Sequence, residues 1–95
     1  MIHVADEVSP AHPALAGHFP GNPIVPGALL LARVAHAAAQ AFGAAVAEVP
    51  TVKFLAPLRP GERFDVGLDA SEAKVRFRVT RGATLIASGT LSLAR

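Results

Sequence analysis

A histidine at position 18 stands in the most constrained part of the chain. It is followed by a run of prolines and glycines, and residues 18–27 read HFPGNPIVPG. Prolines fix the backbone angle φ, and glycines let the backbone approach other groups closely. Because histidine is the side chain whose ordinary pKa lies near neutral pH, a ring held by such a loop is a candidate for proton-transfer chemistry.

A second set of polar residues follows on a predicted helix over residues 27–43. Inside it the polar side chains are Arg33, His36 and Gln40, and the other positions are Gly, Ala, Leu, Val or Phe. At helical spacing the three polar residues fall in one stripe about 60° wide. Pro26 suits the start of a helix and Gly43 suits its end. A helix that is apolar over most of its circumference is expected to be a buried central helix.

The sequence does not favour metal, redox or disulfide chemistry. There is no cysteine, which excludes disulfides and thiolate ligands. The chain has four histidines, but no two of them stand at ligand spacing on a predicted element with a carboxylate nearby. We therefore predict neither a metal site nor a cofactor.

The elements around the helix are predicted to be strands. Residues 2–8 read as a short strand, and residues 9–27 form a long loop whose apolar residues indicate that it is packed. After the helix the apolar period changes to two over residues 48–58, 62–71, 73–81 and 83–94. Residues 74–79 alternate cations with apolar residues, as in an antiparallel strand with one solvated face. This order predicts an α+β domain with one sheet around one helix.

Length and composition set the scale of the molecule. Ninety-five residues make one domain, and 52% of them are hydrophobic, which is more apolar surface than a small monomer hides easily. An oligomer is therefore expected.

The N-terminus has no basic region followed by a long apolar run, and the uncharged residues 19–32 contain prolines and glycines. A soluble, cytoplasmic protein without a membrane span is the prediction.

Two stretches resemble a known family. Residues 18–27 resemble the signature loop of the hotdog-fold 3-hydroxyacyl-(acyl-carrier-protein) dehydratases of fatty-acid synthesis (FabA/FabZ-like), and residues 52–64, VKFLAPLRPGERF, resemble that family's second recognisable stretch. The resemblance implies a single hotdog domain over residues 1–95. It also implies a lyase that dehydrates a 3-hydroxyacyl thioester, carried on acyl-carrier protein or coenzyme A, to a trans-2-enoyl thioester in fatty-acid or polyketide-type synthesis.

The resemblance also implies roles for particular residues. A base must remove the proton at C2, and a backbone N–H at a helix start can stabilise the thioester oxygen. By this resemblance His18 is the base and Gly27 supplies the N–H, with His36 as the third catalytic candidate. The candidate substrate-binding residues are Phe19, Pro20, Gly21, Val25, Pro26, Ala32 and Arg33.

The acid of the family is missing. Its members carry a glutamate or aspartate fourteen residues after the histidine, and here that position is Ala32. Three interpretations stay open. His36, or a water it holds, replaces the acid, since Arg33 cannot act as an acid near pH 7. Alternatively, a sister subunit supplies the carboxylate, or the chain binds acyl groups without catalysis.

Rival functions and partners complete the expectations. A hotdog thioesterase would also need a polar group near position 32. A nucleic-acid-binding domain would interleave aromatics with Lys74, Arg76 and Arg78, whereas Phe77 alternates away from them. These cations instead fit either a solvated face or docking of an acidic acyl-carrier protein. We expect a homodimer, higher homo-oligomer or heteromer with sheets joined edge to edge, and no nucleic-acid partner.

The apolar residues of these elements are predicted to form the core and the interface. They are Leu29, Leu30, Val34, Phe42, Val52, Phe54, Leu55, Val66, Val75, Phe77, Val79, Leu85, Ile86 and Leu91.

Overall fold

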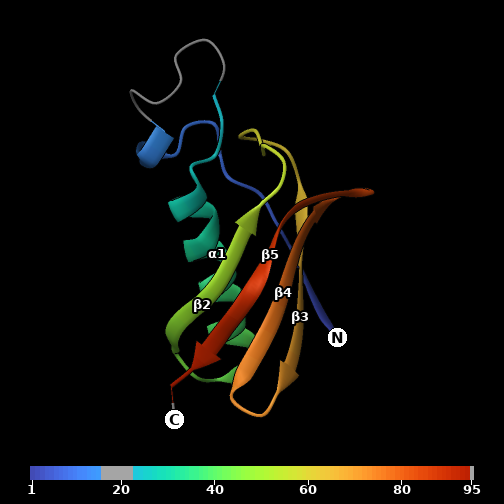
Figure 1. Cartoon of the computed structure of the whole chain (residues 1–95). Coiled ribbons are helices and arrows are strands. Elements are labelled where there is room, and N and C mark those ends of the chain that lie inside the picture. Colours follow the sequence, from blue (N-terminus) through green and yellow to red (C-terminus); the bar gives the residue numbers. More distant parts are fainter. Residues whose placement is uncertain (16–22, 95) are drawn as a thin grey trace.

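The spacing of apolar residues changes from helical to alternating along the sequence, and in the structure one helix is followed by the strands of a sheet. The computed structural model describes residues 1–15 and 23–94 (Figure 1). In chain order the elements are β1 (Ile2–Asp6), a 3-10 helix η1 (Pro13–Leu15), α1 (Gly27–Phe42), β2 (Val46–Phe54), β3 (Phe64–Ser71), β4 (Lys74–Arg81) and β5 (Thr84–Leu93). The predicted α+β arrangement of one long helix and five strands is confirmed.

Helix α1 begins and ends at the predicted signals. The N–H of Leu30 donates to the carbonyl of Pro26 at 3.0 Å, and the N–H of Gly43 donates to the carbonyl of Ala39 at 2.9 Å. The buried face is formed by Leu30, Val34, Ala37 and Ala38. Within the described residues, no helix is long and apolar enough to cross a membrane.

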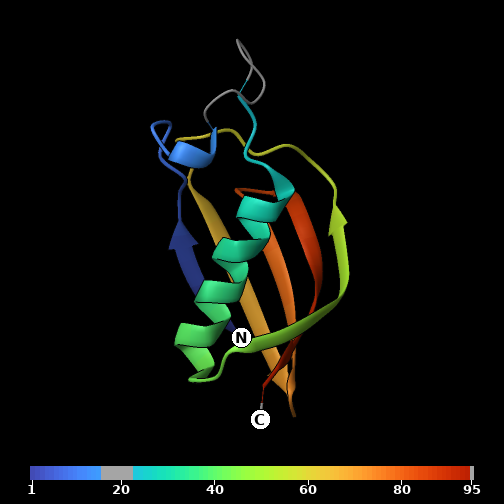
Figure 2. The ribbon, with the colours of Figure 1, turned by 90° about the vertical axis from the view of Figure 1, so that its left-hand side faces the viewer.

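The five strands form one antiparallel sheet in the order β1-β3-β4-β5-β2. In β4, Val75, Phe77 and Val79 are buried, while the cations between them are exposed. This is the alternation that a strand with one covered face requires. Figure 2 shows α1 lying along one face of the curved sheet, and the core fills the space between the two layers.

The structure differs from the sequence expectation after β2. The predicted strand 48–58 ends at Phe54, and residues 55–63 cross over the start of α1 to reach β3 (Figure 2). Phe54 and Leu55, expected in the core or the interface, are 51% and 55% exposed in the single chain. Pro57 and Pro60 in this segment have no N–H to donate to a strand ladder, which fits its departure from the sheet.

Most of the other predicted core residues are buried or packed against the core. The fully buried ones are Leu30, Val34, Val66, Val75, Phe77, Val79, Ile86 and Leu91, and the partly buried ones packed against them are Leu29, Phe42 and Val52.

Candidate active site

A largely apolar pocket of about 370 Å³ opens at the first turn of α1. Two of the predicted site residues, Val25 and Gly27, line it. The opposite wall comes from the end of β2 and the segment after it, and β5 adds one residue. The remaining lining residues are Ile24, Leu30, Phe54, Leu55, Ala56, Pro57, Leu58 and Ile86. The pocket therefore joins the helix start to the second stretch that carried the family resemblance.

Gly27 brings the helix start close to an aromatic ring. A Cβ atom at this position would lie 2.9 Å from Cζ of Phe54, closer than side chains pack. Among the described residues, no side chain caps this end of α1. The first N–H groups of a helix have no partner within the helix, and the helix dipole makes this end positive. Because Gly27 lines the pocket, the backbone donors of this helix end are candidates to stabilise charge on a carbonyl oxygen bound there.

Two hydrogen-bond connections hold the pocket walls together. The N–H of Val25 donates to the carbonyl of Leu58 at 2.7 Å, which ties the segment before α1 to the segment after β2. The N–H of Leu55 donates to the carbonyl of Ile86 at 2.8 Å, which ties that segment to β5. Leu58 is 2% exposed and anchors this wall in the core.

The sequence prediction did not assign residues 54–58 to a site. It treated Phe54 and Leu55 as core and interface residues and ended the strand at position 58. The signal that identifies them is the break in period: positions 54–58 are consecutively apolar, whereas a strand with one covered face alternates.

The polar stripe of α1 lies on a different flank. The Nη2 group of Arg33 donates to the carbonyl of Glu7 at 2.6 Å, and its Nε lies 3.2 Å from a carboxylate oxygen of Asp6, without hydrogen-bond geometry. His36 lines a groove of about 540 Å³ between α1 and β1, together with Arg33 and Gln40. The structure therefore does not bring His36 to the Gly27 pocket of the same chain.

Ala32, where the resemblance places the family's acid, is exposed on α1 in the single chain. Pro26 directly precedes α1 and accepts the hydrogen bond of its first turn. The predicted residues His18, Phe19, Pro20 and Gly21 lie outside the described residues. Their roles stay predictions. In residues 1–15 and 23–94, no group of three or more histidine, aspartate or glutamate side chains gathers at metal-binding distance.

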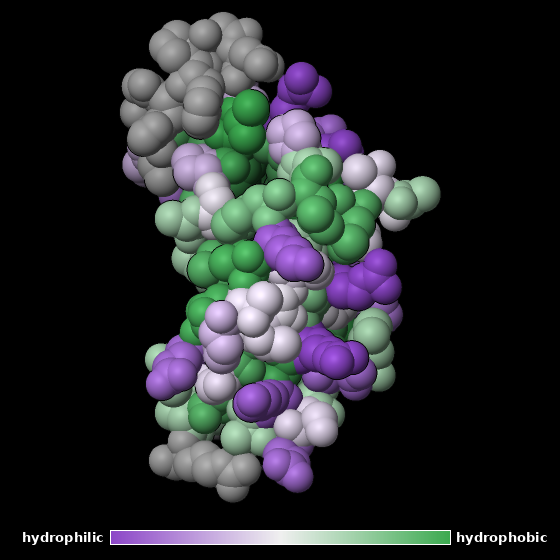
Figure 3. Space-filling view, viewed as in Figure 1, coloured by the Kyte–Doolittle hydropathy of each residue, from purple (hydrophilic) through white to green (hydrophobic). Residues whose placement is uncertain are grey.

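The outer face of the sheet, away from α1, carries a cationic row. Arg76 and Arg78 of β4 stand opposite Thr90 and Ser88 of β5, and Lys53 of β2 stands beyond Ser88. Figure 3 shows hydrophilic residues gathered over this face. Within the described part of the chain, none of these three cations takes part in an ion pair. Asp69 of β3 stands opposite Arg76 on the same face, so the three cations exceed this carboxylate and leave positive charge for an acidic partner.

Comparison with known protein families gives a clear match. The model of the ApeI-like family, described as ApeI dehydratase, matches residues 1–90. The 3-hydroxyacyl-(acyl-carrier-protein) dehydratase FabZ of Aliarcobacter butzleri is 32% identical, over 83% of this chain and 63% of that protein. FabZ of Klebsiella pneumoniae is 35% identical over 100% of this chain and 56% of that protein. The chain thus spans just over half to just under two thirds of the length of these relatives.

Solved structures match over nearly the whole chain. The dehydratase heterocomplex ApeI:P from Xenorhabdus doucetiae is 27% identical with a TM-score of 0.80, over 98% of this chain and 86% of that chain. A mutant of the fluoroacetyl-CoA-specific thioesterase FlK has a TM-score of 0.72 at 16% identity, over 99% of this chain and 88% of that chain, and it supports the fold alone. The hotdog fold implied by the sequence is confirmed.

Proposed function

Because the chain belongs to the ApeI-like dehydratase family, we propose that it removes water from a 3-hydroxyacyl thioester to give a trans-2-enoyl thioester. The observation that carries this proposal is the apolar pocket that ends at Gly27 and the start of α1. An acyl chain suits the apolar walls, and the thioester oxygen suits the backbone donors at the helix start.

The reaction needs a base, a donor to the thioester oxygen and an acid, and the first two are assigned to this chain. In the proposed reaction, His18 takes the proton from C2, and the electron pair moves toward the thioester carbonyl. The N–H of Gly27 stabilises the charge that develops on that oxygen. The C3 hydroxyl then leaves as water once it receives a proton, and the C2–C3 double bond forms. The residue that donates this last proton is not assigned, because Ala32 stands where the resemblance places the family's acid.

A heteromer is the second candidate. The solved structure with a TM-score of 0.80 is a dehydratase heterocomplex, which makes a two-subunit site a specific alternative. In this alternative a sister subunit supplies a carboxylate where this chain has Ala32, and the present chain supplies the Gly27 pocket. His36 lies on the other flank of α1, so any role for it at a Gly27 pocket also requires a second chain.

The partner we propose is an acidic acyl-carrier protein. The cationic row of Lys53, Arg76 and Arg78 offers charge complementarity for it. Electrostatic docking of this kind weakens as salt rises. Turnover of a carrier-linked substrate should therefore fall with salt more steeply than turnover of the coenzyme A-linked substrate.

The test is hydration of a trans-2-enoyl thioester, the reverse reaction, followed as loss of the conjugated enoyl absorbance. The chain is compared with His18→Ala, Ala32→Glu and, as a histidine control on the outer strand β1, His3→Ala. We expect slow turnover by the native chain and a loss of about 10²–10⁴-fold in His18→Ala, the usual worth of general base catalysis. His3→Ala should keep the native rate.

The variants separate the candidates. If the native chain is silent and Ala32→Glu gains turnover, the pocket is intact and the chain is an acyl-binding subunit or half of a heteromer. Adding purified sister subunit to the native chain then distinguishes these two. If the native chain, Ala32→Glu and the mixture with a sister subunit are all silent, the dehydratase proposal is wrong.

A further inference from the structure

We propose that Arg81, at the end of β4, is a positioning residue that holds the pocket wall against the start of α1. The inference rests on the proposed function of that pocket, although its structural part can be tested without activity. Arg81 does not line the pocket itself. It acts through residues 57–62, which connect β2 to β3.

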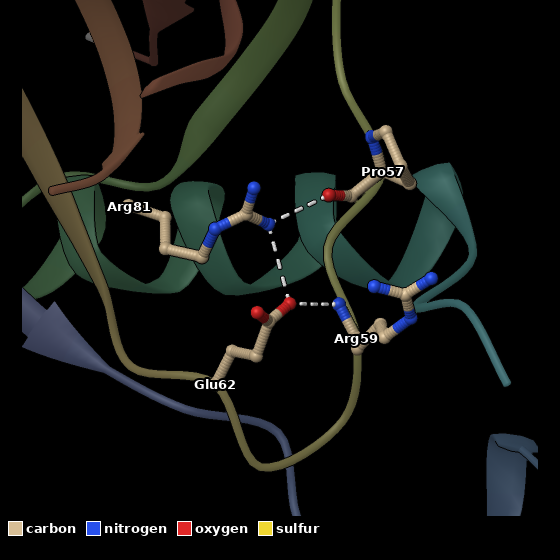
Figure 4. A network of polar contacts seen from close by, with 4 residues as sticks. All are labelled: Pro57, Arg59, Glu62 and Arg81. Carbon is tan, nitrogen blue, oxygen red and sulfur yellow. Dashed lines mark hydrogen bonds and ion pairs between the residues drawn. The ribbon is translucent and has the colours of Figure 1, made fainter. Parts of the chain in front are cut away.

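One guanidinium nitrogen of Arg81 makes two contacts. Its Nη1 group donates to the carbonyl of Pro57 at 2.8 Å and lies 3.2 Å from Oε1 of Glu62 (Figure 4). The same Glu62 oxygen accepts the backbone N–H of Arg59 at 2.7 Å. Arg81 thus contacts both ends of the turn 57–62, directly at Pro57 and Glu62, and connects the turn to the end of β4.

From this turn the contacts lead to the helix start. Leu58, between Pro57 and Arg59, accepts the N–H of Val25 at 2.7 Å. Val25 and Gly27 both line the pocket and are two residues apart. A displacement of Pro57 and Leu58 would therefore move Val25, and with it the backbone donors at Gly27.

The contribution of Arg81 is geometric rather than a large ion-pair energy. The side chains of Arg81 and Glu62 are 32% and 33% exposed, and partly exposed pairs contribute little to stability. One planar guanidinium that contacts both a carbonyl and a carboxylate, however, fixes the direction of these two groups. Small displacements of catalytic donors cost large factors in rate, which is why such a contact matters at an active site.

The experiment compares Arg81→Met with Arg63→Met by amide hydrogen exchange and by kinetics. Arg63 is an exposed arginine beside Glu62, so its replacement removes the same charge from the neighbourhood of the turn 57–62. In Arg81→Met we expect exchange at the Val25 amide to accelerate at least about tenfold, as expected for local opening, while amides of β3 and β4 keep their protection. Arg63→Met should leave exchange at Val25 unchanged.

Kinetics supply the second measurement. For Arg81→Met, kcat for enoyl hydration should fall about tenfold while KM changes less than about threefold, because the donors serve the charged transition state. Arg81→Lys keeps one donor to Pro57 and should recover part of the loss.

Two results would overturn the proposal. One is unchanged exchange at Val25 in Arg81→Met. The other is faster exchange throughout the sheet, which would mean that Arg81 contributes only to global stability. If the native chain, Ala32→Glu and the mixture with a sister subunit are all silent, the proposed function fails, and the exchange pattern alone decides the role of Arg81.

Discussion

At Gly27 the absence of a side chain lets an aromatic ring and a helix start meet. The Phe54 ring lies 2.9 Å from where a Cβ atom would be, and both residues line the pocket. Phe54 is half exposed, so its ring can turn away. The residue type at this position therefore controls the shape of the pocket more than the stability of the fold.

Gly27→Ala should impair activity and spare stability. The added Cβ displaces the Phe54 ring at the mouth of the pocket, and we expect kcat/KM for enoyl hydration to fall at least about tenfold, as misplaced substrates lose rate steeply. The free energy of unfolding should change by less than about 1 kcal/mol, because alanine favours the helix. Steady-state kinetics and urea unfolding measure both.

The control is a double-mutant cycle with Phe54→Ala. If the collision is the cause, Gly27→Ala should have little further effect once the ring is gone. Equal losses with and without the ring would show that Gly27 matters for another reason.

Arg33, a predicted substrate-binding residue, contacts other groups of the same chain. Its position on a polar helix stripe made it a candidate substrate contact. In the structure its guanidinium contacts the carboxylate of Asp6 and the carbonyl of Glu7, at the end of β1. Both side chains are about one third exposed, so this pair contributes little stability. The contacts connect α1 to the end of β1, and a role toward substrate stays a prediction.

At the scale of elements, the sheet depends on a close contact between three strands. Phe77 of β4, Gly89 of β5 and Val52 of β2 occupy one row across the sheet. A Cβ atom at Gly89 would collide with the carbonyl oxygen of Thr51 and lie 2.8 Å from the Phe77 ring. Phe77 is 2% exposed and cannot turn into solvent. Here glycine is required by packing.

Gly89→Ala should therefore destabilise the fold. Since neither the Thr51 backbone nor the buried ring can move freely, we expect a loss of about 3 kcal/mol in the free energy of unfolding, typical of overpacking a core. Urea unfolding followed by far-ultraviolet circular dichroism measures it. The control is Ser88→Ala, at the residue before Gly89 in β5, which should change the free energy of unfolding by less than about 0.5 kcal/mol. A small loss at position 89 would mean that β2 can shift away from β5.

At the scale of the whole molecule, the β2 side of the sheet is where another chain is expected. Strand β2 is an edge strand and pairs only with β5 in the described sheet. The exposed large apolar residues Phe54 and Leu55 stand at its end. A chain that is 52% hydrophobic gains from covering such a surface. We propose that two chains, identical or related, join along β2.

Replacing Phe54 and Leu55 together by serine should weaken this assembly. Removing two large apolar side chains from an interface costs several kcal/mol, so we expect a shift of the mass in solution toward the monomer. Sedimentation velocity measures it across a concentration series. Ile2→Ser makes a similar change on the opposite edge strand, where the side chain is 40% exposed, and should leave the mass unchanged. If Ile2→Ser alone dissociates the protein, the interface lies on β1 instead.

The α+β class, the extent of α1 and the alternating strands could be predicted from the sequence alone. These features depend on spacing between near neighbours, such as Val75, Phe77 and Val79 in β4, so they can be read without coordinates. The loop motif also indicated the family, which the family comparison confirms. The contacts between distant residues become visible only in the folded chain: Phe54 with Gly27, Arg33 with Asp6, and Arg81 with Pro57 and Glu62. These partners lie far apart in sequence, and only the curvature of the sheet around the helix brings them within contact distance.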